Sequence, residues 1–405
     1  MADKILFLTL IGVLAVLGSS LPTNSWLPEA ESYEGHVLLS IKTSTEDHVK
    51  ALLEMETTEQ MTGIDFWKEP RQAKGNVHVR VPPKHATKME EFLLKHGLEF
   101  EVILEDIGQI VEHEKEVLAN RTVFEQDDEP SNLTLGQFHD IDEIGNPGQN
   151  KSKAVMHGCL HSREWVGCST MLYIINELTQ NAENYAHLLD KLDIYILPVA
   201  NPDGYWVTWN WNRFWRKTLS GPHEKTDDRT CIGVDPNRNW DFQFRVVGFE
   251  SDPCSELFPG FTAFSEPEVR AIADFLTANN DSIKVYIDVH AYGELFMYPY
   301  GYARTYPENV DELDHVAGQA TQAINRVHKA QFKHGSILDI IYPASGSSID
   351  YAKGILGIDY TYALELRPDL DEDPGFIVDE SDIVPIAEET WAGLQVVLSR
   401  VAGKQ

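Results

Sequence analysis

The chain has 405 residues, and its 42% hydrophobic and 24% charged content is typical of a folded globular protein. This length predicts two or three domains, or one large domain with an appendage. The formal net charge of -31 at pH 7 argues against a nucleic-acid partner, because phosphate binding requires concentrated lysine and arginine.

The N-terminal segment is typical of a cleavable secretory signal. Lys4 precedes an apolar run over 5–17, which the small residues 18–20 follow. About thirteen residues are too few to span a bilayer. We therefore expect residues 1–20 to be a signal peptide, and the mature protein to be soluble, secreted and free of any membrane partner.

Short strand and helix patterns then alternate up to about residue 104. The expected elements are, in chain order, strand 35–41, helix 45–56, strand 77–81, helix 86–96 and strand 99–104. Their order predicts a small α+β unit of βαββαβ, ferredoxin-like topology.

A charged connecting helix is expected over 109–118, followed by an acidic, proline-containing stretch at 127–130 that is typical of an exposed linker. Arg121 lies beside this linker and suits a trypsin-like cut. The alternative is an ordinary surface arginine.

From residue 154 onward, strands and helices alternate to the C-terminus. The expected strands are 154–159, 193–199, 284–289 and 360–366, and the expected helices are 166–178, 266–278, 312–328 and 386–401. This order predicts an α/β sheet with helices on its faces.

Three candidate metal ligands fall at the ends of these strands. His161 and Glu164 occupy the turn between strand 154–159 and the next helix, and His290 follows strand 284–289. The carboxyl ends of strands are where ligands collect in α/β sheets. Two imidazoles and one carboxylate are typical of a catalytic zinc, because the fourth position stays open for a water that the metal acidifies.

In a secreted protein the four cysteines can pair in three ways. Cys231 and Cys254 bracket a loop-rich segment and are the first choice for a bridge. For Cys159 and Cys168, which flank the candidate metal turn, a second bridge, free buried thiols and a Cys159 metal ligand all remain open, with free thiols favoured.

A zinc hydrolase also needs a general base and a cation for the oxyanion. Glu365 is a carboxylate in an otherwise apolar strand, although a structural ion pair would explain it too. Arg216 could polarise a carbonyl, and the run 235–240 sets the guanidinium of Arg238 between two amides, which suits capture of a carboxylate.

Together these residues resemble the zinc metallocarboxypeptidases of the pancreatic A and B type. The resemblance covers nearly the whole chain through the motifs HSREW, NPDGY, WRKT, GVDPNRNWD, IYPASGSSIDY and ELR. It implies a mixed, mostly parallel sheet with helices on both faces. It also implies a zymogen with an activation propeptide over 21–121 and a catalytic domain over 122–405.

The resemblance implies one Zn²⁺ per chain, held by His161, Glu164 and His290. Glu365 is then the general base that takes the proton from zinc-bound water, and Arg216 holds the oxyanion.

The resemblance also assigns residues to the substrate. Asn237, Arg238 and a mobile Tyr342 grip the terminal carboxylate, which makes the enzyme an exopeptidase acting on peptide and protein C-termini. Arg163 and Tyr292 line the neighbouring subsites.

By the same resemblance, Asp235 is the partner of a zinc histidine, and Ile349 sets the side-chain preference. An acidic residue at position 349 makes a basic-residue enzyme in this family; isoleucine would leave a substrate lysine or arginine unpaired, so apolar residues are expected. The other pocket positions are Met297, Gly301, Ile337, Ala344 and Ala363.

One departure from the family concerns the segment between residues 144 and 154. Family members place a helix and a two-strand hairpin there, roughly three dozen residues, whereas this chain passes directly through GNPGQNKSK. Without these residues, an edge of the sheet and the apolar face under the absent helix would be exposed. Ala291 and Pro368 are smaller departures near the site.

The leading hypothesis is a secreted, monomeric zymogen, inhibited by its own propeptide and activated by a trypsin-like protease, that removes C-terminal hydrophobic residues. The alternatives are a truncated, inactive zinc-binding homologue and a related zinc amidohydrolase or deacylase.

Overall fold

The computed structural model describes residues 32–56, 63–70, 73–119, 142–144, 151–225, 230–328, 330–369 and 375–403. The expected signal peptide, Arg121 and the linker 127–130 lie outside these ranges. The chain divides into two compact units. One comprises Glu31–Thr134 with Pro368–Val378, and the other comprises Leu135–Arg367 with Met1–Ala30 and Asp379–Gln405. Each unit is described by itself.

The N-terminal unit has the expected βαββαβ topology. Its elements are β1 (Val37–Thr43), α1 (Glu46–Glu56), β2 (Asp65–Lys68), β3 (Gly75–Val81), η2 (Pro83–His85), α2 (Ala86–His96), β4 (Glu99–Leu104) and α3 (Ile107–Ala119). The sheet is antiparallel with strand order β2-β3-β1-β4. Helix α2 ends at Gly97, which adopts the left-handed conformation (φ 65°) that glycine reaches at least cost.

The larger unit is built on a seven-stranded mixed sheet, of order β12-β11-β13-β10-β6-β7-β5. Its strands are β5 (Asp142–Ile144), β6 (Ser152–Gly158), β7 (Leu192–Leu197), β10 (Ile283–Gly293), β11 (Leu295–Tyr298), β12 (Lys333–Ser336) and β13 (Tyr360–Asp369). The short strands β8 (Glu224–Lys225) and β9 (Thr230–Cys231) form a separate ribbon.

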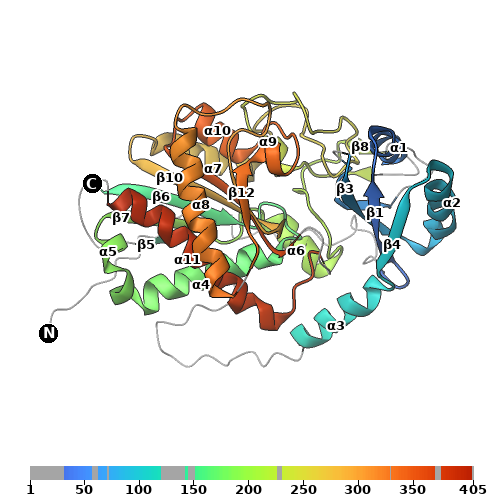
Figure 1. Ribbon diagram of the computed structural model, residues 1–405, viewed down its shortest axis with the longest axis horizontal. Helices are drawn as coiled ribbons and strands as arrows, with labels where there is room; N and C mark the ends of the chain where they lie inside the picture. Colours follow the sequence, from blue (N-terminus) through green and yellow to red (C-terminus); the bar gives the residue numbers. More distant parts are fainter. Residues whose placement is uncertain are drawn as a thin grey trace, which may run out of the picture. The chain divides into compact units, whose positions relative to one another are not determined.

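Helices cover both faces of this sheet (Figure 1). The helical elements are α4 (Trp165–Gln180), η3 (Ala182–Tyr185), α5 (Ala186–Leu189), α6 (Pro202–Asn210), η4 (Pro236–Arg238), α7 (Pro267–Ala278), α8 (Val310–Val327), α9 (Ile337–Ile340), α10 (Ser348–Gly354) and α11 (Glu380–Ala402). Helices α4, α8 and α11 pack together on one face, while α7 and α10 lie on the other. No described helix is both long and apolar enough to cross a membrane.

The predicted end of the central strand, β10, was too early. Strand β10 was expected to stop at Val289, but it continues to Gly293, so His290 lies inside the strand. All the residues from Asp288 to Gly293 are buried, so sheet pairing and packing extend the strand beyond the apolar run.

Strand β5 occupies the sheet edge next to the shortened segment. It pairs antiparallel with β7, while β6 lies parallel to β7 on the other side. The outer edge of β7 is therefore paired over Ile194–Ile196. The edge that was expected to be exposed is thus paired along these three residues.

The structure contains two disulfides. The bridge between Cys231 and Cys254 was predicted. Cys159 and Cys168 form the second bridge, so the expectation that favoured free thiols was wrong. The strand-to-helix turn brings their Cα atoms to 5.3 Å, a separation that a disulfide can span.

Candidate metal centre

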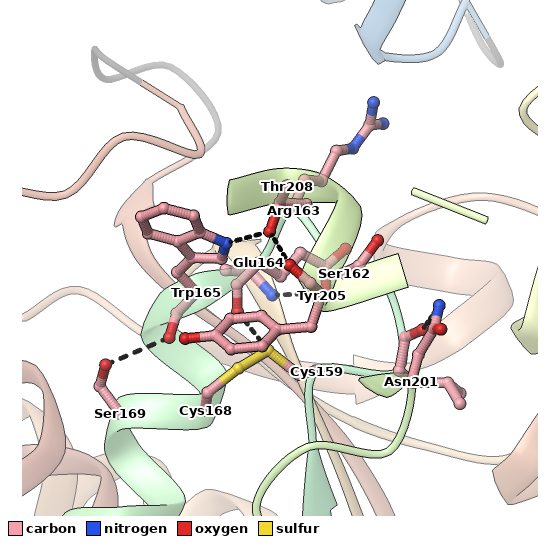
Figure 2. Close-up of a disulfide and its surroundings, with 12 residues drawn as sticks. Cys159, Ser162, Arg163, Glu164, Trp165, Cys168, Ser169, Asn201, Tyr205 and Thr208 are labelled. Carbon is pink, nitrogen blue, oxygen red and sulfur yellow. Dashed lines mark hydrogen bonds between the residues drawn. A yellow bond between two sulfur atoms is a disulfide. The ribbon is translucent and has the colours of Figure 1, made fainter. Parts of the chain in front are cut away.

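The turn between β6 and α4 carries two of the expected metal ligands. Glu164 directly precedes the first residue of α4, and His161 lies three residues earlier. The Cys159–Cys168 bridge joins the start of this turn to the first part of α4 (Figure 2). His161 and Glu164 therefore lie within a covalently closed loop, which restricts the backbone that presents them.

The structure brings all three expected ligands together. Ligand atoms of His161, Glu164 and His290 lie within 4.8 Å of one another, and all three residues are buried. Glu164 lies between the two imidazoles, with Oε1 2.9 Å from Nδ1 of His161 and Oε2 2.9 Å from Nδ1 of His290. Both rings thus present the same nitrogen to one carboxylate.

The electrostatics of this cluster suit a cation. Burial opposes ionisation of Glu164, but His161 and His290 outweigh it and lower the pKa of the carboxyl. Burial alone would lower the pKa of His290, whereas Asp288 and Glu164 raise it well above its ordinary value. Two imidazoles and a carboxylate converging from separate elements form a donor set that fits Zn²⁺ with one coordination position left over.

Asp235 holds the outer side of His161, as the resemblance implied. Its Oδ1 lies 3.0 Å from Nε2 of that ring. Oδ1 also accepts the backbone N–H of Asn237 at 2.9 Å, and Oδ2 accepts Nη2 of Arg216 at 3.0 Å. Burial opposes ionisation of Asp235, yet Arg216 and Arg238 bring its pKa well below the ordinary value.

The expected base and oxyanion cation lie beside the ligands. Glu365 is on β13, opposite Leu295 of β11. Burial raises the pKa of Glu365, and its Oε2 has no hydrogen-bond partner among the described residues. Nη1 of Arg216 lies 3.9 Å from Oε1 of Glu164.

Arg238 has one nitrogen unused. Its Nε donates to the carbonyl of Gly248 at 2.6 Å and Nη1 to the carbonyl of Asn237 at 3.0 Å. Nη2 is buried, with no hydrogen-bond partner in the described parts of the chain. The ring centroid of Tyr342 lies 5.9 Å from the guanidinium carbon. An unsatisfied, buried guanidinium N–H is well suited to an anionic ligand.

Asn237, an expected substrate contact, is hydrogen-bonded within the chain. Its Oδ1 accepts the backbone N–H of Ser348 at 2.9 Å, and its Nδ2 lies 3.0 Å from Nε2 of His290. In this structure the amide thus contacts the outer side of a metal ligand.

Arg163 and Tyr292, the expected subsite residues, are both buried. Nη1 of Arg163 donates to the carbonyl of Phe214 at 3.3 Å and lies 3.9 Å from Oε2 of Glu256. Arg163 is therefore held by the chain, which limits the ligands that its guanidinium can reach.

The expected pocket residues form two groups of contacts, and Ile349 is buried on a separate element. Met297 pairs with Ala363 across β11 and β13. A Cβ atom on Gly301 would lie 2.8 Å from the carbonyl oxygen of Ala344 and 3.0 Å from Cγ2 of Ile337, so only glycine fits there. Ile349 is also buried, at the start of α10.

The sequence reasoning missed Asp288. Its Oδ1 lies 2.9 Å from Nε2 of His290, where it mirrors the contact of Asp235 with His161. The signal was present as an aspartate two residues before the histidine, because alternate residues of a strand point to the same face.

Known proteins share this architecture. The family model "Zinc carboxypeptidase" matches residues 136–393, and "Carboxypeptidase activation peptide" matches residues 39–114. Carboxypeptidase A2 of Mus musculus is 35% identical, over 92% of this chain and 95% of the relative, and carboxypeptidase A1 of Mus musculus is 34% identical, over 91% and 94%.

Solved structures agree with these sequence matches. Carboxypeptidase A from Helicoverpa armigera superposes with a TM-score of 0.81 at 28% identity, over 92% of this chain and 99% of that chain. Thrombin activatable fibrinolysis inhibitor superposes with a TM-score of 0.80 at 27% identity, over 92% and 100%.

The alignment with the mouse A2 enzyme also bears on the shortened segment. It is 408 positions long but spans 92% of 405 residues, which is about 373. The difference, about 35 positions, must therefore be gaps opposite this chain. That size is consistent with the expected loss of roughly three dozen residues before Ala154.

Proposed function

This chain belongs to the zinc carboxypeptidase family and carries its activation peptide, and from that premise we propose that it is a secreted enzyme removing C-terminal hydrophobic residues from peptides and proteins. The observation that carries the proposal is the arrangement of unsatisfied groups around the ligand cluster. Glu365 Oε2 and Arg238 Nη2 are both buried without hydrogen-bond partners among the described residues.

The ligand cluster holds the metal in this proposal. His161, Glu164 and His290 bind Zn²⁺, which supplies an acidified water and polarises the scissile carbonyl when it is bound. Asp235 keeps the His161 ring oriented through Nε2, and the closed loop between Cys159 and Cys168 fixes the backbone of the first two ligands.

Glu365 acts as the general base. Its raised pKa favours proton uptake, and the positive charge of bound zinc would bring that pKa back toward neutrality. Arg216 stabilises the negative charge that develops on the carbonyl oxygen. Its salt bridge with Asp235 keeps the guanidinium pointed toward Glu164.

Arg238 recognises the substrate's terminal carboxylate through Nη2, with Asn237 and Tyr342 as additional contacts. Tyr342 lies near two cations, since it stacks toward Arg238 and interacts electrostatically with Arg216. A carboxylate that must reach Arg238 explains an exopeptidase, because only a chain terminus carries it. Arg163 and Tyr292 contact the preceding residues of the substrate.

Ile349 sets the preference for apolar side chains. A lysine or arginine side chain buried against Ile349 would lack a counter-charge. The relatives named carboxypeptidase A1 and A2 support an A-like preference.

The proposal also includes activation. A trypsin-like protease cuts near Arg121 and releases the propeptide over 21–121. The product is secreted and monomeric. Arg121 lies outside the described residues. Incubation with trypsin, followed by mass spectrometry and activity measurement, tests the activation step. Full activity with residues 21–121 still attached would contradict it.

Turnover of peptides ending in Phe, Leu or Lys, measured with and without a zinc chelator, tests the chemistry. We expect turnover of the Phe and Leu peptides that the chelator abolishes and added zinc restores. Preferential turnover of the Lys peptide would refute the assignment of Ile349, and activity that resists the chelator would refute the metal.

A further inference from the structure

A column of polar side chains lies on the face of β10 that carries the ligand His290. Tyr286, Asp288 and His290 are alternate residues of this strand and therefore project to the same face. His157 of β6 is the register partner of Asp288, and its side chain lies on that face too. All four side chains are buried.

The two metal-ligand histidines have matching surroundings. Each presents Nδ1 to an oxygen of Glu164 at 2.9 Å. Each also presents Nε2 to a fully buried aspartate, at 3.0 Å for His161 and Asp235, and at 2.9 Å for His290 and Asp288. A carboxylate behind a ligating histidine fixes the ring orientation and raises the basicity of the ligand nitrogen.

The two aspartates differ in what else they hold. Asp235 has further partners for both oxygens, the backbone N–H of Asn237 on Oδ1 and Arg216 on Oδ2. Asp288 is anchored through Oδ2, which accepts the hydroxyl of Ser348 and, at 3.4 Å, Nδ2 of Asn237. Its Oδ1 has no hydrogen-bond partner in the described parts of the chain, and Nε2 of His290 lies 2.9 Å from it. The geometry therefore leaves Oδ1 of Asp288 available to that ring.

A proton count identifies Asp288 as the acceptor. When His290 binds a cation through Nδ1, its remaining proton is on Nε2, which can then only donate. Nδ2 of Asn237, 3.0 Å from Nε2, is itself a donor and cannot accept that proton. Asp288 supplies the acceptor, and the Asn237 amide becomes available for another partner.

His157 lies beside Asp288 on the neighbouring strand. Nε2 of His157 lies 2.7 Å from the hydroxyl of Tyr286, which sets the orientation of the ring. Nδ1 then lies 3.5 Å from Oδ1 of Asp288. The side chain of Asp288 is thus packed against β6 and hydrogen-bonded to Ser348 of α10.

We propose that Asp288 is a positioning residue for zinc: its carboxylate accepts the Nε2–H of His290 and holds Nδ1 toward Glu164, while His157 and Ser348 restrain the carboxylate. This inference rests on the metal ligands assigned under the proposed function. Asp288 itself touches neither the metal nor the substrate.

The test compares zinc affinity in four variants of the full chain, by competition with a chromophoric chelator. D288A removes the acceptor, and D288N keeps the volume but removes the charge. D281N makes the same charge change at an exposed aspartate just before β10, and H290A removes a ligand. We expect zinc affinity to fall about 10- to 100-fold in D288A and by about tenfold in D288N, with D281N unchanged and H290A weakest.

Two further readouts keep the test decisive. Visible absorption of the cobalt-loaded protein reports ligand geometry and should change in D288N but not in D281N. Thermal unfolding with chelator present identifies a variant that does not fold. If D288A does not fold, the zinc affinity of D288N tests the proposal.

The outcomes separate this inference from the proposed function. Wild-type zinc affinity in a folded Asp288 variant, beside a clear loss in H290A, overturns the positioning assignment and leaves the metal site intact. An equal loss in D281N also overturns it, as a general charge effect. Wild-type affinity in H290A overturns the proposed ligands, and the inference with them.

Discussion

Both units of this protein bury a histidine beside a charged partner, yet the two partners have opposite signs. In the catalytic unit, His290 lies between Glu164 and Asp288, and these carboxylates raise its pKa despite burial. In the N-terminal unit, Nδ1 of His36 lies 3.0 Å from Nη1 of Arg80. Burial and then Arg80 lower the pKa of His36 to about 4.

The contrast shows that burial by itself lowers the pKa of an imidazole in both units, and that charged neighbours either add to this effect or overcome it. The catalytic unit concentrates carboxylates around its histidines and is therefore suited to hold a cation. The N-terminal unit keeps His36 neutral beside an arginine and should be sensitive to acid. Four predictions test this division, from the largest expected effect to the smallest.

The first prediction concerns Glu365, the proposed general base. Glu365→Gln should lower kcat about 10²- to 10⁴-fold, because a general base contributes about that much. Zinc content should stay at the wild-type level, as measured by atomic absorption. Glu308→Gln, at an exposed glutamate, is the matched control. A small loss of kcat in E365Q would show that the carboxylates near the metal serve only to hold it.

The second prediction compares the two disulfides of the larger unit. Replacing either cysteine pair by alanine should lower the free energy of unfolding by about 3 kcal/mol, because the closed loops span 9 and 23 residues. Only the Cys159/Cys168 double variant should also release zinc faster, since its loop carries His161 and Glu164. Chemical denaturation and chelator-induced zinc release measure the two effects. Equal zinc retention in both double variants would contradict the special role of the first bridge.

The third prediction places a carboxylate in the apolar pocket. Ile349→Asp should raise kcat/KM for a peptide ending in Lys, relative to one ending in Phe, by about 10- to 100-fold. The physical reason is that a buried ammonium gains a counter-charge worth roughly 1.5–3 kcal/mol. Ile355→Asp makes the same change at a residue that is 54% exposed and should not alter the preference. An unchanged ratio in I349D would exclude Ile349 from the pocket.

The fourth prediction concerns acid and the N-terminal unit. Because the folded pKa of His36 is below its unfolded value of 6.5, the unfolded chain takes up the proton first as the pH falls. This proton uptake lowers the free energy of unfolding. The loss is absent above pH 6.5, grows as the pH falls toward 4, and amounts to about 2 kcal/mol at pH 5. Hydrogen exchange of amides in β1 and β3 should accelerate accordingly between pH 7 and pH 5, after correction for intrinsic exchange.

His36→Asn separates this effect from other acid-sensitive groups. The variant cannot take up the proton, so its exchange in β1 and β3 should depend less on pH than that of the wild type. His113→Asn, at an exposed histidine of α3 in the same unit, serves as the control. The same pH dependence in H36N and wild type would remove the contrast between the two units.

Several features were determined by the sequence alone. In the N-terminal unit, local periodicity predicted β1, α1, β3, α2 and β4 but not the four-residue strand β2, and α2 spans the predicted 86–96 because Gly97 ends it. His161 and Glu164 could be proposed as ligands because a strand, a short turn and a helix can be recognised from neighbouring residues, and the structure places both beside His290. His290 was found because a strand pattern leads into it.

Other features were decided only by the tertiary structure. Asp288 acquires its role from the register of β10 with β6 and from the approach of α10, which brings His157 and Ser348 to it from distant parts of the chain. The Cys159–Cys168 bridge required a turn tight enough to bring the two Cα atoms together. The pairing of β5 with β7 joins Asp142–Ile144 to residues 194–196, which are far apart in the chain. Local periodicity determines which element forms, but contacts between elements depend on register and packing, which no single stretch of sequence contains.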